Sequence, residues 1–535
     1  MNKKVTFFDN FYWKVFLKSW LFCCVVYSFM LFQFWWGNHD WDYLKYGVKF
    51  SSGFFEARYA AHLVSLLLFD GNVLPVFMLL SALALLVFMG MLIAYYLEME
   101  KNTISYMLFL LLIGVSPYNF VIIYYLFIAD SLFSCGCVAA AVLFCATAPY
   151  KWWKFVLGVL GYIYILGCYP PVIALTAILF VAKQIILVQK KRQINQRLFS
   201  DTLFLIGQAS LSFLVFKCVF DILDKYNFLY LNMYNVRVNS LMDIPSLVPA
   251  QIVSFFGYVP SLFANFGFVF AFFIGVLFLV GIFYIWNSFR NKLIAFAWII
   301  AFILSSRIVF LLADSANVAK FRVEYWAVLG METFVLAVLF SCKQKAVKNI
   351  LYLTIVLSLF SFIRMTFYIQ KMQYLSFKGE RFYQGRIENR LADFPNLLAD
   401  GYYSVLRMGY ADFSEKYCYA TSIGCNMEFF ADTAMPADFS KVIFWESLNN
   451  MHILRLGFWS DRLWVVDNTK MNLQPFVLKD ENISNLRYWL YQTTKAYPSK
   501  DCIYVDDKLV VFNLDDKFFR PNREKVIFGM NILKR

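Results

Sequence analysis

Long apolar runs separated by short polar gaps dominate the first 371 residues of this chain. Each run approaches the 20 or so mostly apolar residues that a helix needs to cross the hydrocarbon core of a bilayer. The pattern predicts eleven membrane-spanning helices. They are centred on residues 14–35, 75–96, 103–119, 127–148, 153–169, 171–189, 199–221, 264–287, 293–312, 325–341 and 350–370. The predicted fold class is therefore an α-helical polytopic membrane protein.

The division between the fifth and sixth spans depends on the segment Cys168-Tyr169-Pro170-Pro171. One long kinked helix is the alternative interpretation of this region. Two consecutive prolines oppose a continuous helix, because proline lacks a backbone N–H and its ring clashes with the preceding helical turn. The sequence thus favours a turn between two separate spans.

Lysine and arginine are distributed unevenly among the polar gaps, and the distribution predicts an orientation. The gaps rich in these residues alternate strictly with gaps that are poor in them, and basic loops lie on the cytoplasmic side. The basic set consists of Lys3, Lys4, Lys14, Lys101, Lys151, Lys154, Lys190, Lys191, Arg192, Arg197, Arg290, Lys292, Lys343, Lys345 and Lys348. With eleven spans, the N-terminus is expected inside and the C-terminus outside. The first apolar run lacks an A-x-A cleavage pattern, so we expect it to be retained as a helix.

From about Met372 the chain becomes polar and changes its pattern. Short alternating segments typical of strands are interspersed with stretches of helical periodicity. The strand-like segments are Lys441–Trp445, Leu463–Val466, Cys502–Val505 and Leu509–Asn513, and the helical ones are Ile387–Leu398 and Ser484–Thr494. We therefore expect a transmembrane domain over residues 1–371 and a small extracytoplasmic α/β domain over residues 372–535.

Composition and charge agree with lipid as the main solvent. Of the residues, 61% are hydrophobic and 16% are charged, whereas about 25% are charged in soluble proteins. The net charge of +14 lies in the gaps between apolar runs rather than on a basic face, which argues against a nucleic-acid partner. The segment Cys135-Gly136-Cys137 has no histidine or carboxylate cluster beside it, so no metal site is predicted. The sequence leaves dependence on a divalent metal open.

Three acidic residues are expected at the outer face. Asp40 and Asp42 flank Trp41 in the loop after the first span. They form either an interfacial site or an ordinary wet loop within an aromatic belt, and we favour the site because an aromatic belt alone does not require acids. Asp130 stands at the outer mouth of an apolar helix, where it either lines a cavity or caps the helix.

Basic residues at the same face point to phosphate. Arg307 lies near the outer end of its span, and Lys320 and Arg322 lie where the next span begins. Arginine grips phosphate through a planar fork that stays protonated, whereas an arginine near a headgroup can also snorkel. Arg307 is too deep to snorkel easily, so we expect phosphate contact there. Lys320 and Arg322 suit either role.

A carboxylate and several arginines on one face match glycosyl transfer from a polyprenyl-phosphate sugar. We expect Asp40 to act as general base, with Asp42 as its substitute. Arg58 and Arg307 would contact the donor phosphate. Two further roles complete the predicted site: Asp130 would position acceptor or sugar hydroxyls, and an aromatic pair would form a surface on which the sugar stacks. That pair is Trp41 and Tyr169.

Several of these segments together resemble the serotype-converting O-antigen glucosyltransferases, a multipass family with a GT-C architecture. The similar segments are His39-Asp40-Trp41-Asp42, Ala57-Arg58, Ser116-Pro117-Tyr118-Asn119 through Asp130-Ser131-Leu132, Cys168-Tyr169-Pro170-Pro171, Arg307, and the closing stretch from Pro498 to Val511. Ala57 stands where the family has glycine, and Pro170 where it has glutamine.

The resemblance implies a donor such as undecaprenyl-phosphate glucose and an acceptor that is a repeat unit of a surface polysaccharide. It implies transfer on the periplasmic face of a bacterial inner membrane, with no cofactor. Two other classes of protein stay open. A transporter or flippase of lipid-linked glycans also needs many spans, although transporters often show repeated halves, which this sequence lacks. A membrane-anchored binding or assembly protein would act through its outer domain.

Overall fold

The computed structural model describes most of the helical part of the chain and the strands near its end. The described residues are 10–33, 48–50, 53–54, 58–123, 125–191, 197–226, 242–266, 268–312, 320–341, 345–391, 403–408, 453–459, 462–466, 473–474, 503–506 and 509–513. The chain forms two compact units. The first holds the helices up to Met372, and the second holds the described strands.

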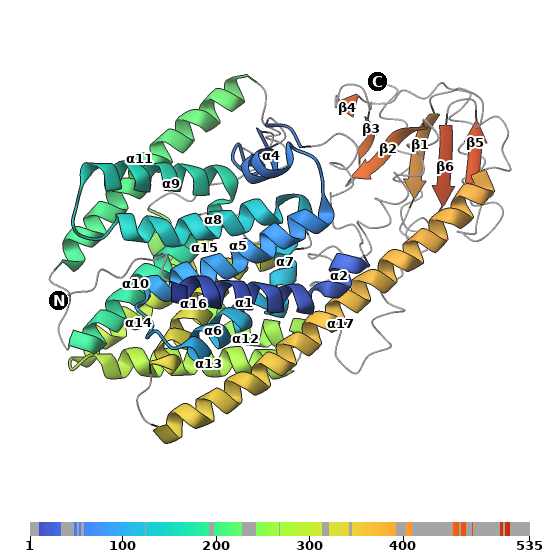
Figure 1. The fold of residues 1–535 in the computed structure, drawn as a ribbon. Helices are drawn as coiled ribbons and strands as arrows, with labels where there is room; N and C mark the ends of the chain where they lie inside the picture. Colours follow the sequence, from blue (N-terminus) through green and yellow to red (C-terminus); the bar gives the residue numbers. More distant parts are fainter. Residues whose placement is uncertain are drawn as a thin grey trace. The chain divides into compact units, whose positions relative to one another are not determined.

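Helices account for nearly all of the first unit (Figure 1). In chain order they are α1 (Asn10–Val26), α2 (Ser28–Phe32), α4 (Leu63–Phe69), α5 (Pro75–Tyr96), α6 (Thr103–Gly114), η2 (Pro117–Asn119), α7 (Phe120–Ile123), α8 (Leu126–Cys145), α9 (Trp152–Cys168), η3 (Pro170–Val172), α10 (Ile173–Lys191), α11 (Leu198–Lys225), α12 (Ile244–Phe266), α13 (Phe268–Ser288), α14 (Lys292–Ser306), α15 (Ile308–Leu312), α16 (Lys320–Phe340) and α17 (Lys345–Leu391).

The lengths and apolar character of these helices make the chain a multipass helical membrane protein. Within the described part, seven helices are long and apolar enough to cross a bilayer, or eight if the bent pair Thr103–Gly114 and Pro117–Ile123 is one span. The shorter apolar helices are Trp152–Cys168, Ile244–Gly257 and Lys292–Ser306. Every predicted span overlaps a helix. The count of eleven and the orientation remain predictions.

Local sequence explains several helix boundaries. Pro75 occupies the first turn of α5, where a missing N–H costs nothing. The side chain of Asn102 caps α6 by accepting a hydrogen bond from the Ser105 amide at 3.1 Å. The predicted turn between the fifth and sixth spans is confirmed, because α9 ends at Cys168 and η3 begins at Pro170.

Helix α12 differs from the prediction, which placed no span over most of its length. It runs from Ile244 to Phe266 although Pro249 and Pro260 lie inside it. Prolines usually end or kink a helix, and they divide its apolar stretch into pieces shorter than a span. Tertiary contacts with α13, α14 and α15 hold this helix in place.

The core of the first unit is built on α5 and α8. Helix α5 packs against α8, α6 and α1, while α10 packs against α14 and α16. Small residues permit the closest approaches. A methyl group at Gly136 of α8 would lie 2.3 Å from Met89 Sδ and 2.8 Å from Trp326 Cζ3, so the absence of a side chain brings α8 close to α5 and α16.

Among the described helices, α11 packs mainly against α9. It is largely exposed, and only 11% of its most apolar stretch is buried. Two of its few buried side chains are polar and bind the α9 backbone. Gln208 Nε2 donates to the Lys154 carbonyl at 3.2 Å, and Ser212 Oγ donates to the Val159 carbonyl at 2.9 Å.

A cluster of charges fastens the loop after α5 to α10. The backbone of Glu98 has a positive φ of 55°. Its carboxylate lies 2.8 Å from Lys183 Nζ and 3.4 Å from Lys190 Nζ. Lys183 Nζ also donates to the Tyr96 carbonyl at 2.7 Å. Burial alone would raise the pKa of Glu98, but the two lysines outweigh it and hold that pKa below its ordinary value.

The described strands of the second unit form one six-stranded sheet with the order β4-β3-β2-β1-β6-β5. Strand β1 (Tyr403–Met408) pairs in parallel with both β2 (Ile453–Trp459) and β6 (Leu509–Asn513). The antiparallel strands β3 (Arg462–Val466), β4 (Leu473–Gln474) and β5 (Ile503–Asp506) complete the two sides.

Sequence patterning located three of these strands. The predicted segments Leu463–Val466, Cys502–Val505 and Leu509–Asn513 overlap β3, β5 and β6. The predicted strand Lys441–Trp445 and the predicted helix Ser484–Thr494 lie outside the described residues. The boundary at residue 371, the α/β class of the outer domain and its side of the membrane remain predictions.

Candidate functional site

Two predicted site residues meet at the turn between α9 and η3. The Cζ atom of Arg58 lies 5.4 Å from the centre of the Tyr169 ring, within the range of a cation–π interaction. The Tyr169 ring is buried, and Arg58 is partly exposed. An arginine and an aromatic residue separated by more than 100 positions in sequence are therefore neighbours in the fold.

The segment that carries Arg58 is tied to the end of α9 by its next two residues. The Ala60 amide donates to the Gly167 carbonyl at 2.8 Å, and the Tyr59 hydroxyl donates to the Ile163 carbonyl at 3.1 Å. A methyl group at Gly167 would lie 2.2 Å from Tyr59 Cε2. Glycine at this position is what allows the Tyr59 ring to lie against the helix.

Asp130 is fully buried beside the same turn. Its Oδ1 accepts a hydrogen bond from the Ser131 amide at 2.6 Å, and its Oδ2 has no hydrogen-bond partner among the described residues. The Cys168 thiol donates to the Ser131 carbonyl at 3.6 Å, which joins this part of α8 to the turn that holds Tyr169. Asp130 is the fifth residue of α8, whose N-cap is Tyr125, so the interpretation of Asp130 as a helix cap is wrong.

His62 lies over the first turn of α8 and was not among the predicted site residues. Its ring stacks on that of Phe127, with centroids 6.0 Å apart, and it is buried. Phe127 precedes Asp130 by three residues, so the two side chains share a face of α8. The only sequence signal for this position was the rarity of histidine, since the chain has three.

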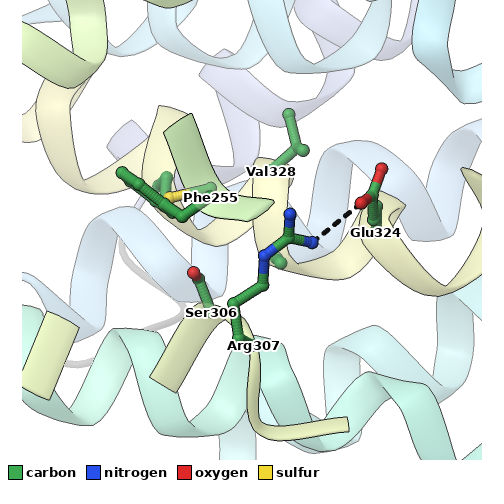
Figure 2. A pocket seen from close by; sticks show the side chains of 7 residues that line it. Phe255, Ser306, Arg307, Glu324 and Val328 are labelled. Carbon is green, nitrogen blue, oxygen red and sulfur yellow. Dashed lines mark hydrogen bonds and ion pairs between the residues drawn. The ribbon is translucent and has the colours of Figure 1, made fainter. Parts of the chain in front are cut away.

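A second charged group lies where α12, α14 and α16 converge. Arg307 follows the last residue of α14, and its Nη1 lies 2.7 Å from Glu324 Oε1 on α16 (Figure 2). Its Nη2 donates to both the backbone carbonyl and the side-chain hydroxyl of Ser254 on α12, each at 2.8 Å. Both charged side chains are almost completely buried, at 4% and 1% exposure.

The surroundings of this ion pair are apolar and tightly packed. The Phe310 ring lies 5.2 Å from Arg307 Cζ, and the pocket beside the pair has room for roughly one water molecule. The residues that line the pocket are Phe255, Ser306, Arg307, Glu324, Ala327, Val328 and Met331. A buried pair in such surroundings needs its additional hydrogen bonds to offset the loss of hydration.

The two groups lie on neighbouring elements. Helix α16 contacts η3, which begins directly after Tyr169. The ring of Phe133, one turn after Asp130, has its centroid 6.4 Å from that of Tyr325, which follows Glu324. The Tyr325 hydroxyl donates to Asn119 Oδ1 of η2 at 2.8 Å, so the residue after Glu324 contacts both α8 and η2.

The side chains of the remaining predicted site residues lie outside the described part of the chain. Asp40, Trp41 and Asp42 lie outside the described residues. Lys320 and Arg322 lie in the first turn of α16, but their side chains are outside the described part. Among the described residues, no group of three or more histidine, cysteine or acidic side chains could hold a metal ion.

Fold and site together define a multipass helical membrane protein with charged side chains buried among its helices. No protein-family model matches the chain, and no curated protein matches it either. The resemblance to O-antigen glucosyltransferases therefore depends on the sequence motifs alone.

Proposed function

We propose that this protein is a membrane glycosyltransferase that moves a hexose, glucose in the first instance, from a polyprenyl-phosphate donor onto a surface polysaccharide such as O-antigen. The observation that carries the proposal is the contact of Arg58 with Tyr169 at the turn after α9, to which Ser131, the residue after Asp130, is hydrogen-bonded. These residues come from three distant parts of the chain and supply a cation, a carboxyl group and an aromatic surface, which are the groups that the reaction needs.

The chemistry is a substitution at the anomeric carbon of the donor sugar. An acceptor hydroxyl attacks that carbon, the bond to the phosphate oxygen breaks, and the lipid phosphate leaves with the electron pair. Asp40 takes the proton of the hydroxyl, with Asp42 as its substitute. Arg58 and Arg307 balance the charge on the phosphate, while Lys320 and Arg322 are further candidates for that contact.

The sugar itself would be held by the remaining groups. Tyr169 and Trp41 provide faces on which a sugar ring stacks, and Asp130 accepts hydrogen bonds from acceptor or sugar hydroxyls. Its Oδ2 has no hydrogen-bond partner among the described residues, and burial makes an unsatisfied carboxylate oxygen costly. A bound sugar hydroxyl would satisfy this oxygen.

The cellular setting follows from the same proposal. Eleven spans in a GT-C-like arrangement would place the reaction on the periplasmic face of a bacterial inner membrane, with the N-terminus in the cytoplasm. The C-terminal domain, proposed as a small α/β domain, would help to bind the acceptor. The donor would be made by a separate enzyme and moved across the membrane by a flippase.

Transfer of radiolabelled hexose from the lipid donor to polysaccharide, measured in detergent, tests the proposal. We expect the double variant Asp40→Asn, Asp42→Asn to lose about 10²- to 10⁴-fold in rate, the usual contribution of a general base. Asp130→Asn should also lose activity. The control is Asp221→Asn on the surface of α11, where the carboxylate is exposed and paired with Lys217. A fully active double variant would rule out the assignment.

A transporter or flippase of lipid-linked glycans is the second candidate. The buried pair of Arg307 and Glu324 favours it, since charges enclosed by membrane helices often mark a substrate pathway. The same assay separates the two candidates. Label that moves onto glycan supports the transferase, and label that stays on lipid while the lipid crosses the membrane supports the flippase.

A further inference from the structure

The guanidinium of Arg307 already has partners at both of its Nη atoms. Nη1 faces Glu324, and Nη2 faces two oxygens of Ser254. The Phe310 ring lies 5.2 Å from Cζ. The Nη side of the guanidinium is therefore already occupied by groups of the protein itself, whereas Nε has no hydrogen-bond partner among the described residues.

We propose that Glu324 is a stand-in for the donor phosphate. Its carboxylate pairs with Arg307 when no donor is bound, and the lipid phosphate displaces that carboxylate when it binds. Glu324 then sets the affinity of the protein for its donor. This inference rests on the proposed function, because it concerns the phosphate of the same donor.

The size of the pocket argues for exchange rather than addition. The space beside the ion pair has room for roughly one water molecule. A phosphate group, with four oxygens around phosphorus, is larger than that. It reaches the two Nη atoms only by taking the place of a group that contacts them.

Charge and flexibility decide which of the groups that contact Arg307 a phosphate displaces. One oxygen of Ser254 belongs to the backbone of α12 and is fixed by the helix. The Glu324 carboxylate is carried by a side chain with rotatable bonds, and it is negative, so a phosphate beside it would be repelled. Arginine binds phosphate and carboxylate through the same bidentate geometry. Glu324 is therefore the contact that a phosphate replaces.

A purely structural pair would behave differently. If Glu324 only fastened α16 to the end of α14, its removal would loosen the site and weaken the binding of donor. If Glu324 competes with phosphate for Arg307, its neutralisation frees the guanidinium and strengthens binding. The two roles thus predict opposite changes in affinity for the same substitution.

The experiment measures the binding of farnesyl phosphate to the full-length protein in detergent by titration calorimetry. Glu324→Gln should bind this probe about tenfold more tightly than wild type, and Arg307→Gln at least tenfold more weakly. Glu332→Gln is the matched control, since Glu332 is also a buried acid on α16 at 3% exposure but lines no part of the Arg307 pocket. Its affinity should equal that of wild type.

The outcomes separate this inference from the proposed function. Binding that needs Arg307 but is unchanged or weaker in Glu324→Gln overturns the stand-in role and leaves the transferase proposal intact. Absence of Arg307-dependent binding in every variant overturns the phosphate role of Arg307, and with it this inference, while hexose transfer can still be measured independently. If Glu324→Gln fails to fold, Glu324→Asp replaces it. The shorter carboxylate weakens the pair, so tighter binding supports the inference and weaker or equal binding refutes it.

Discussion

Replacing Gly167 with alanine tests how the segment of Arg58 is held against α9. The added Cβ would lie 2.2, 2.4 and 2.8 Å from three atoms of the Tyr59 ring. Carbon atoms ordinarily approach to about 3.5 Å. The Tyr59 ring must therefore move away from the added Cβ. The Tyr59 hydroxyl would then leave the Ile163 carbonyl, and the neighbouring Arg58 would shift relative to Tyr169.

The energetic cost can be worked out from these contacts. Overpacking of this kind costs about 1–3 kcal/mol, and the lost hydrogen bond of Tyr59 costs about 1 kcal/mol more. Alanine is favoured over glycine within a helix by up to about 1 kcal/mol, which acts in the opposite direction. We expect Gly167→Ala to lower the free energy of unfolding by about 1–3 kcal/mol and to reduce hexose transfer.

Unfolding by a denaturing detergent, followed by circular dichroism, measures this change. Gly207→Ala on α11 is the matched control, because its Cβ would meet only Phe155, at 3.4 and 3.8 Å. That variant should be as stable as wild type or slightly more stable. Adding Tyr59→Ala should remove most of the extra cost of Gly167→Ala. Equal stability of the two glycine variants would refute the contact between this segment and α9.

Two further predictions concern the polar contacts within the helical unit. Because the folded pKa of Glu98 is depressed below its ordinary value of 4.5, its ion pairs with Lys183 and Lys190 stabilise the protein above that pH and lose their effect as pH falls through the folded pKa. Thermal unfolding between pH 7 and pH 3 should show this loss, and Glu98→Gln should reduce it; an identical pH profile would contradict it. Tyr325→Phe removes the hydrogen bond to Asn119 and should cost about 1–3 kcal/mol, because it leaves a buried amide oxygen unsatisfied. An unfolding free energy within 0.5 kcal/mol or so of wild type would contradict that contact.

Sequence patterning located the helices well where apolar runs were long and their ends marked by proline or polar residues. Helix α5 coincides with the predicted 75–96 span, since Pro75 begins an unbroken apolar run. Strand β6 coincides with the predicted Leu509–Asn513. Helix α12 escaped prediction because Pro249 and Pro260 interrupt its pattern. Its stability depends on neighbours that no local pattern reveals.

For the candidate site, the sequence suggested individual residues but not the contacts between them. Asp130 and Arg307 stood out because charge is costly near lipid, whereas the roles expected of Arg58 and Tyr169 came from the resemblance to the glucosyltransferases. The partnership of Arg307 with Glu324 could not be predicted, since it depends on which helices meet. Nothing in the sequence indicated that Ser254 would accept hydrogen bonds from Arg307.

The attachment of α11 has a consequence for how this protein behaves in a bilayer. Acyl chains solvate leucine and phenylalanine as well as another helix does, so apolar surface alone gives α11 little reason to remain beside α9. Its amide and hydroxyl side chains, Gln208 and Ser212, have no such alternative in hydrocarbon. A change at either residue that left hydropathy intact would still insert correctly, yet the helix could drift away from its neighbour within the plane of the membrane.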